Sequence, residues 1–189
     1  MENMQQVCSK VRNATYKLSL YDAAEKNDIL MAVADKIEQN KENIKKINAI
    51  DIQNAKGKLS EAMIDRLTLT DSRIALMAEG VRQVAALDDP VGKVVREWKV
   101  ESGLEIKKVR APLGVIGVIY ESRPNVTVDV ASLCIKSGNG VILKGGKEAI
   151  NTNRVLFEII KEAIGGLGLD NDIVGFVDNV VRKATYEML

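Results

Sequence analysis

Hydrophobic positions recur every three to four residues through the first 89 positions of the chain, which is the spacing of amphipathic helices. We expect helices over residues 2–20, after Asp22, up to Gly57, after Ser60 and after Thr70. The second of them begins with a capping-box pattern, because Asp22 is followed three positions later by Glu25. The expected buried positions are Val7, Val11, Ala14 and Leu18, then Ile29, Leu30, Val33, Ala34 and Ile37, then Ile74, Met77, Val81 and Val84.

After Gly92 the pattern changes to short apolar runs that are typical of strands. Residues 94–100 and 104–109 flank the turn 101–103, which indicates a β-hairpin. A two-stranded ribbon is marginally stable alone in water, so we expect it to lean on another part of the fold or on another subunit. The charges along it indicate one solvent-exposed face, and Trp98, the only tryptophan, is expected to be a packing anchor.

Residues 112–189 predict alternating strands and helices. The β-branched run 114–120 is typical of a strand buried on both faces, and Pro124 suits the first turn of a helix. The expected apolar positions of that helix are Val126, Val130, Leu133 and Cys134, and Gly138-Asn139 ends it. Strands over 141–143 and 173–177 and helices over 149–164 and from 180 onward follow. We therefore expect three parallel strands, part of a doubly wound sheet with one edge unpaired.

These elements predict an α/β chain in three segments. Residues 1–92 form a helical layer, 93–111 a β-hairpin arm for assembly, and 112–189 a partial dinucleotide-binding domain. The last helix runs into Leu189 without a glycine stop, so the chain end is expected to be a cut and not the natural end of a domain.

Composition narrows the class of protein. The 27 basic and 26 acidic residues nearly cancel, which argues against nucleic acid and membrane surfaces as partners. Two cysteines make no disulfide framework, and no apolar run approaches the roughly 20 residues that cross a bilayer. We expect a soluble, cytoplasmic protein. The absence of histidine excludes Ser-His and Cys-His pairs and histidine metal sites from this chain.

Two loops carry the candidate chemistry. Lys144-Gly145-Gly146-Lys147 follows a strand and precedes a helix, a context that commonly holds phosphate groups: glycines admit a ligand, lysines supply charge, and free helical N–H groups follow. It is neither a G-x-G-x-x-G motif nor a Walker A motif, and a plain strand-to-helix turn is the alternative.

The second loop, Glu121-Ser122-Arg123-Pro124-Asn125, lies at the carboxyl end of the first parallel strand, where open sheets place ligands. Asn125 could donate its amide to an oxyanion, and Arg123 could bind a phosphate or carboxylate. In the alternative interpretation Asn125 caps the helix and Arg123 pairs with Glu121. Cys134 lies on the helical stripe and is expected to be a buried, inert thiol.

The segment YESRPNVTVDVASLCIKSGNGVILKGGKE, residues 120–148, resembles the gamma-glutamyl phosphate reductase family within the aldehyde dehydrogenase superfamily. The likeness extends to LSEAMIDRLTLT, VRQVAALDDPVGKV, ESGLEIKKVRAPLGV and the terminal ATYEML. It implies an aldehyde-dehydrogenase-like fold and the NADPH-dependent reduction of gamma-glutamyl phosphate to glutamate 5-semialdehyde and phosphate, a step of proline biosynthesis. It also implies a homo-oligomer, with association with glutamate 5-kinase as a further expectation.

The resemblance gives roles to the two loops. Asn125 is similar to the oxyanion-hole asparagine of the superfamily, Lys144 to the lysine near the adenosine ribose, and Arg123 is assigned to the acyl phosphate. Many NAD-using relatives have an acid where Lys147 stands, so a cation there favours the 2′-phosphate of NADPH. The implied cofactor-binding residues are Glu121, Ser122, Pro124, Lys144, Gly145, Gly146 and Lys147.

The chain departs from the family in one respect. The nucleophilic cysteine of these enzymes belongs to a catalytic domain that is C-terminal to everything in this sequence, and Cys134 corresponds to a helix position. Our first hypothesis is therefore a cofactor-binding N-terminal part that is inactive alone. The second is a non-catalytic interaction or assembly module, in which the hairpin and the unpaired sheet edge drive association. An NADPH titration beside a solution mass separates the two hypotheses.

Overall fold

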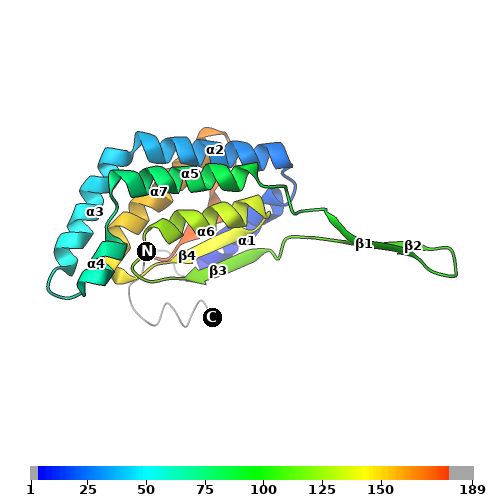
Figure 1. Ribbon diagram of the computed structural model, residues 1–189. Coiled ribbons are helices and arrows are strands. Elements are labelled where there is room, and N and C mark those ends of the chain that lie inside the picture. Colours follow the sequence, from blue (N-terminus) through cyan, green and yellow to red (C-terminus); the bar gives the residue numbers. More distant parts are fainter. Residues whose placement is uncertain (1–3, 179–189) are drawn as a thin grey trace.

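The computed structural model describes residues 4–178 and has an α/β fold (Figure 1). The N-terminal helices are α1 (Met4–Leu18), α2 (Ala23–Gln39), α3 (Lys41–Ala55), α4 (Glu61–Leu67) and α5 (Asp71–Ala86). The hairpin strands β1 (Val94–Lys99) and β2 (Glu105–Val109) follow. The remaining elements are β3 (Val115–Ile119), α6 (Asn125–Lys136), β4 (Gly140–Lys144), η1 (Lys147–Ala149), α7 (Ile150–Gly166), η2 (Asn171–Ile173) and β5 (Val174–Phe176). The helix predicted from residue 180 lies outside the described residues.

The sheet is parallel and has the strand order β3-β4-β5, which confirms the three predicted strands. β4 is the central strand and all five of its residues are buried. Its last residue, Lys144, is in register with Ile119 at the end of β3. The loops that follow β3 and β4 therefore leave the same end of the sheet, where the two candidate loops were expected to lie.

Alternate residues of β4 enter different clusters of the core, which separates the two faces of the sheet. Val141 and Leu143 belong to the main cluster, together with residues of α2, α5, α6 and α7. Ile142 packs with Val11 of α1 on the other face. Figure 1 shows α2 and α5 as an outer layer over α6 and α7, with α1 on the far side of the sheet. The predicted segment boundaries at residues 92 and 111 stay a prediction.

The N-terminal helices follow the predicted pattern closely. The whole expected stripe of α2 is buried, from Ile29 to Ile37. The capping box is present: Glu25 N donates to Asp22 Oδ1 at 2.9 Å and Asp22 N donates to Glu25 Oε2 at 2.8 Å. Among the described helices, none is long and apolar enough to cross a membrane.

The inward face of α6 differs from the predicted one. Leu133, expected to be buried, is 52% exposed, and Val126 and Val130 are only partly buried. The buried positions are Thr127, Val128, Ala131, Ser132, Cys134, Ile135 and Lys136. Polar side chains share this face because each has a hydrogen-bond partner. Ser132 Oγ donates within the helix to Val128 O at 2.8 Å, whereas Thr127 and Lys136 bond to other elements. The predicted buried face, which was based on apolar residues, is therefore rotated about the helix axis relative to the observed one.

β3 is not buried on both faces, so the expectation of a fully buried strand over residues 114–120 is wrong. Among the described strands it lies at the edge of the sheet, and its residues are partly or largely exposed. Ile116 and Val118 pack against the main core cluster, whereas Ile119 is 44% exposed. The β-branched run was interpreted as central because a half-covered edge strand and a central strand share the same composition.

The hairpin extends away from the body of the molecule (Figure 1). Every residue of β1 is exposed, so neither face leans on the described chain. Trp98 is 36% exposed and contacts the guanidinium of Arg96, whose carbon lies 5.1 Å from the ring centroid. Trp98 is therefore not a packing anchor within residues 4–178. The expected support for the hairpin is not supplied by the described part of this chain.

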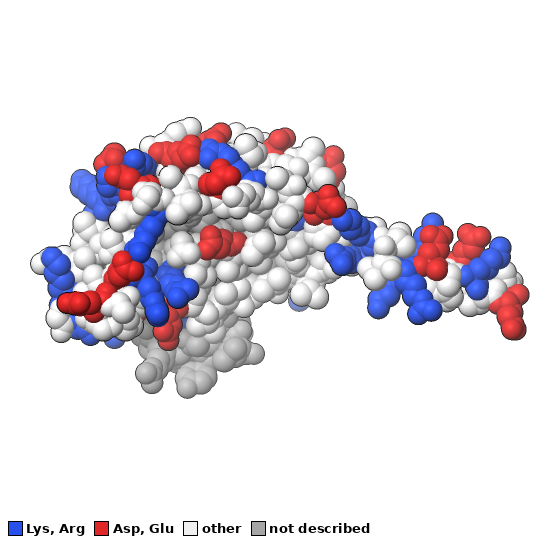
Figure 2. Space-filling model, viewed as in Figure 1, with Lys and Arg blue, Asp and Glu red and all other residues white. Residues whose placement is uncertain are grey.

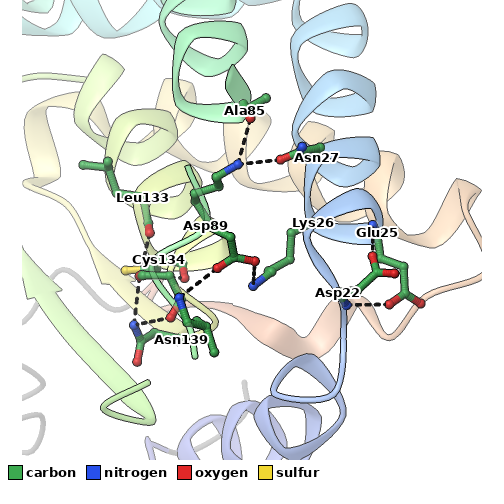
Figure 3. A network of polar contacts seen from close by, with 12 residues as sticks. Asp22, Glu25, Lys26, Asn27, Ala85, Asp89, Leu133, Cys134 and Asn139 are labelled. Atoms are coloured by element: carbon green, nitrogen blue, oxygen red, sulfur yellow. Dashed lines mark hydrogen bonds and ion pairs between the residues drawn. The ribbon is translucent and has the colours of Figure 1, made fainter. Parts of the chain in front are cut away.

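A buried polar network anchors the segment between α5 and the hairpin (Figure 3). Lys26 of α2 is 2% exposed, and its Nζ lies 2.5 Å from Asp89 Oδ2. Lys136 of α6 donates to Asn27 Oδ1 at 2.6 Å and to Ala85 O at 2.8 Å. The amino group of each lysine thus bonds to another element, which fixes the start of the hairpin segment to the helical layers.

This network predicts acid sensitivity. Burial raises the pKa of Asp89, but the hydrogen bonds from Lys26 and from Val91 N outweigh it, so the pKa lies below the ordinary value. An aspartate with a lowered folded-state pKa stabilises the fold above its unfolded pKa of about 3.9 and loses that contribution as the pH falls through the folded-state value. We expect urea midpoints to fall below about pH 4. Asp89→Asn should flatten that decline, and an unchanged slope would contradict the assignment.

Candidate functional site

The two candidate loops touch at the carboxyl end of the sheet. Tyr120 N donates to Lys144 O at 3.0 Å, which extends the β3–β4 pairing by one bond. A Cβ added to Gly146 would lie 3.4 Å from Glu121 Cα. An added methyl group at residue 146 would thus be in ordinary van der Waals contact with the opposite loop, and its nearest neighbour would be Glu148 Oε2 at 2.7 Å. The structure therefore brings the two predicted loops side by side at one end of the sheet.

A hydrogen-bonded chain lies beneath the glycine loop. Thr127 Oγ1 donates to Asn153 Oδ1 at 3.1 Å and accepts from the hydroxyl of Tyr120 at 2.7 Å. Burial raises the pKa of Tyr120 to about 12, so it remains a donor at neutral pH. A Cβ at the buried Gly145 would collide with Asn153 Nδ2. This chain links the end of β3, α6 and α7, and leaves room for glycine alone at residue 145.

On one side of these loops lies a groove of about 400 Å³, which we call the arginine groove. The loop after β3 and the start of α6 contribute Arg123, Asn125 and Asp129, and the α4–α5 region contributes Arg66 and Arg73. Figure 2 shows this face of the molecule, with basic and acidic side chains gathered over α4 beside the amino end of α6. The groove contains both cations and amide donors, so it can bind an anion.

Asn125 points its amide along α6. Asn125 Nδ2 donates to Asp129 Oδ2 at 2.8 Å, one helical turn later. The helix begins at Asn125, and its N-cap, Pro124, makes no side-chain capping bond. The interpretation of Asn125 as a helix cap is therefore wrong. Burial raises the pKa of Asp129, and the bond from Asn125 opposes that rise. One amide proton of Asn125 is held by Asp129, and the other is left to donate to a ligand.

On the other side lies a second groove of about 390 Å³, which we call the lysine groove. Its lining includes Asp51, Asn54, Lys58, Lys147, Glu148 and Asn151. Lys147 is exposed at the start of η1. Lys144 is buried at the end of β4, with 7% exposure, and lines neither groove. The two lysines of the glycine loop are thus in different surroundings, and Lys147 is the one that can meet a ligand directly.

The amino end of α7 is not free, which corrects the expectation that free helical N–H groups follow the glycine loop. Asp51 of α3 accepts from Thr152 N at 2.8 Å and from Thr152 Oγ1 at 2.6 Å. It also accepts from Asn151 Nδ2 at 2.7 Å. A carboxylate of the protein occupies a position at which a ligand phosphate was expected, and the turn η1 separates the loop from α7. If a phosphate binds here, the charge of Lys147 must therefore contribute more to its binding than the N–H groups of α7 do.

The remaining site residues are placed as follows. Ser122 and Pro124 are buried, whereas Glu121 and Arg123 are exposed. No ion pair between Glu121 and Arg123 occurs among the described residues, so that alternative also fails. Cys134 is 5% exposed, and burial raises the pKa of its thiol to about 11. This confirms that Cys134 is buried, and its pKa keeps it a thiol at neutral pH.

Sequence reasoning missed several residues around the loops. Asp129, Asn153 and Asp51 each act through a partner on another turn or element. Only the spacing of Asn125 and Asp129, four residues apart on a helix, carried a local signal. Arg66 lies on α4, far from the two loops in sequence, and only the folded chain brings it to the same groove as Asn125.

Comparison with known proteins agrees with this architecture. The model of the aldehyde dehydrogenase family matches residues 1–188. The chain is 46% identical over 193 residues to the gamma-glutamyl phosphate reductase of Thermodesulfovibrio yellowstonii, covering 100% of this chain and 46% of that protein. It is 47% identical over 188 residues to the reductase of Enterococcus faecalis, covering 99% of this chain and 45% of that protein. The chain thus spans a little under half the length of these curated relatives.

The crystal structure of gamma-glutamyl phosphate reductase from Thermotoga maritima superposes with a TM-score of 0.95 at 38% identity. The match covers 99% of this chain and 45% of that one. The parallel sheet, the preceding helices and the hairpin are therefore shared features, and the resemblance found in the sequence is confirmed. From the fold, the paired loops and a family match over almost the whole sequence, the chain belongs to the aldehyde dehydrogenase family.

Proposed function

We propose that this chain supplies the cofactor-binding and oxyanion-stabilising part of a cytoplasmic gamma-glutamyl phosphate reductase of proline biosynthesis. Such an enzyme reduces gamma-glutamyl phosphate with NADPH to glutamate 5-semialdehyde and phosphate. The observation that carries the proposal is the contact between the two loops that the resemblance marks, at the end of β3 and β4. The identity of 46–48% to reductases across the chain supports it.

The residues present fit this chemistry. Bound NADPH would supply the hydride that reduces the activated acyl group. Asn125 would donate the amide proton not held by Asp129 to the oxygen of the reacting carbonyl. Lys147 would face the 2′-phosphate of the cofactor, and Gly145 and Gly146 would let it approach the backbone. Glu121, Ser122, Pro124 and Lys144 would complete the cofactor site.

The nucleophile of the reaction is not among the described residues. Cys134 is buried with a raised pKa, and Cys8 lies on α1, across the sheet from the grooves. We infer that the thiol that displaces phosphate from the acyl group, and then carries the acyl group to the hydride, comes from a catalytic domain beyond this sequence. The 189-residue chain alone is then inactive as a reductase.

Replacing Lys147 tests the cofactor assignment. Lys147→Glu places a carboxylate beside the 2′-phosphate, so NADPH should bind about 10- to 100-fold more weakly, while NADH, which lacks that phosphate, should bind at least as well. Fluorescence titration of each cofactor measures the ratio. Lys46→Glu makes the same change of charge at an exposed position of α3 outside both grooves and is the matched control. An equal loss for both cofactors would mean that Lys147 does not select NADPH.

Assembly is a second function that a specific observation favours. Both strands of the hairpin are largely exposed and carry Val94, Val95, Trp98 and Val109 into solvent, and Leu104 in the turn before β2 is exposed as well. Large apolar side chains on a projecting ribbon are typical of an interface. We propose that the hairpin supports homo-oligomer formation, with glutamate 5-kinase as a further partner of the whole enzyme.

A further inference from the structure

The arginine groove contains two cations that have no acidic partner among residues 4–178. Arg66 comes from α4 and Arg123 from the loop after β3. Both are exposed, and neither forms a hydrogen bond or ion pair through its side chain among residues 4–178. Two guanidinium groups from separate elements thus face one groove with their donors unused.

The acidic residues of the same groove are already engaged. Arg73 Nη2 donates to both carboxylate oxygens of Asp65, at 2.9 and 3.0 Å. Arg73 Nη1 donates to Thr68 O at 2.9 Å and to Asp65 O, so this arginine fastens the α4–α5 turn. Asp129 accepts from Asn125. Arg73 cancels the charge of Asp65, whereas the neutral amide of Asn125 does not cancel that of Asp129, so three arginines and two aspartates leave the groove with one net positive charge.

We infer that Arg66 is a specificity residue that binds the α-carboxylate end of the acyl phosphate substrate, an inference that rests on the proposed function. The substrate carries two anionic groups, one at each end of a short carbon chain. The phosphate is attached to the carbonyl whose oxygen Asn125 would bind. Arg123, two positions before Asn125, would bind this phosphate. The second anionic end needs a cation on another element, and Arg66 is the cation that the groove offers. A guanidinium fork binds a carboxylate through two parallel hydrogen bonds.

Titrations of the 189-residue chain test this inference. Its arginine side chains are labelled with ¹⁵N, and L-glutamate, butyrate and inorganic phosphate are added in turn. L-Glutamate should move the Nε–H signal of Arg66, whereas butyrate, which lacks the α-substituents, should not. Phosphate should move the signal of Arg123. Arg66→Ala should weaken L-glutamate binding about 10- to 100-fold and leave phosphate binding unchanged. Arg66→Lys should restore only part of the loss, because an ammonium lacks the fork.

Arg12→Ala is the matched control, because Arg12 is an exposed arginine on α1 that does not line the groove. Equal movement of the Arg12 and Arg66 signals, or an Arg66→Ala variant that still prefers L-glutamate to butyrate, would overturn the inference. NADPH titration of the same variants keeps the two proposals apart. Normal NADPH binding with no effect of Arg66 rejects the inference alone, whereas Arg66-dependent glutamate binding without NADPH binding rejects the reductase assignment.

Discussion

Asp89→Ala should destabilise the chain by about 3 to 5 kcal/mol, the usual cost of leaving a buried ion without its partner. The change removes the carboxylate 2.5 Å from Lys26, whose side chain is 2% exposed. Lys136 is also buried nearby, and the Lys26 charge already contributes to lowering its pKa, after burial itself. Without Asp89, two buried ammonium groups would have less negative charge between them. Urea unfolding measures the free energy directly.

Two further variants make this expectation specific. Asp88→Ala removes the neighbouring carboxylate, which is exposed and pairs with Lys93, and it should change stability little. Adding Lys26→Met to Asp89→Ala should recover part of the loss, because the uncompensated charge is gone. A double variant as unstable as the single one would show that Asp89 acts through its loop geometry and not through the ion pair.

Asp51→Ala should cost about 2 to 6 kcal/mol, because it leaves two buried donors of Thr152 without an acceptor and each costs about 1 to 3 kcal/mol. Asp51 is 2% exposed and also accepts from Asn151. Its loss frees the start of α7, the helix that follows the glycine loop and carries Asn153. Chemical unfolding, with hydrogen exchange of the Thr152 amide, measures both the global and the local effect.

Asp51→Asn separates charge from geometry. An asparagine keeps one acceptor oxygen for Thr152 but loses the negative charge, so it should cost less than alanine does. If the alanine variant leaves the Thr152 amide as protected as in the parent chain, Asp51 does not hold the amino end of α7.

Much of the architecture was predictable because it depends on local patterns. The buried stripe and capping box of α2 were read directly from residues 22–37. The three parallel strands followed from short apolar runs separated by helices. The corrections came where a residue's neighbours are distant in sequence. Whether β3 is central or at the edge depends on which strands flank it, and the face of α6 depends on the helices that cover it.

The site was predictable as two loops but not as two grooves. The glycines and lysines after β4 and the asparagine after β3 are visible in the sequence, and the parallel pairing brings them together. The amide partner of Asn125, the carboxylate at the start of α7 and the arginine of α4 are supplied by folding. Long-range hydrogen bonds leave no periodic trace, so they cannot be found by spacing.

Within residues 4–178 the outer edge of β3 is unpaired, which has a consequence for handling the protein. Its outward backbone groups and the half-exposed Ile119 form a ready template onto which any extended, apolar segment can add as a further strand. A preparation of the chain would therefore grow less monodisperse as concentration rises, and β-rich aggregates would begin at this border and not at the well-covered helical layers.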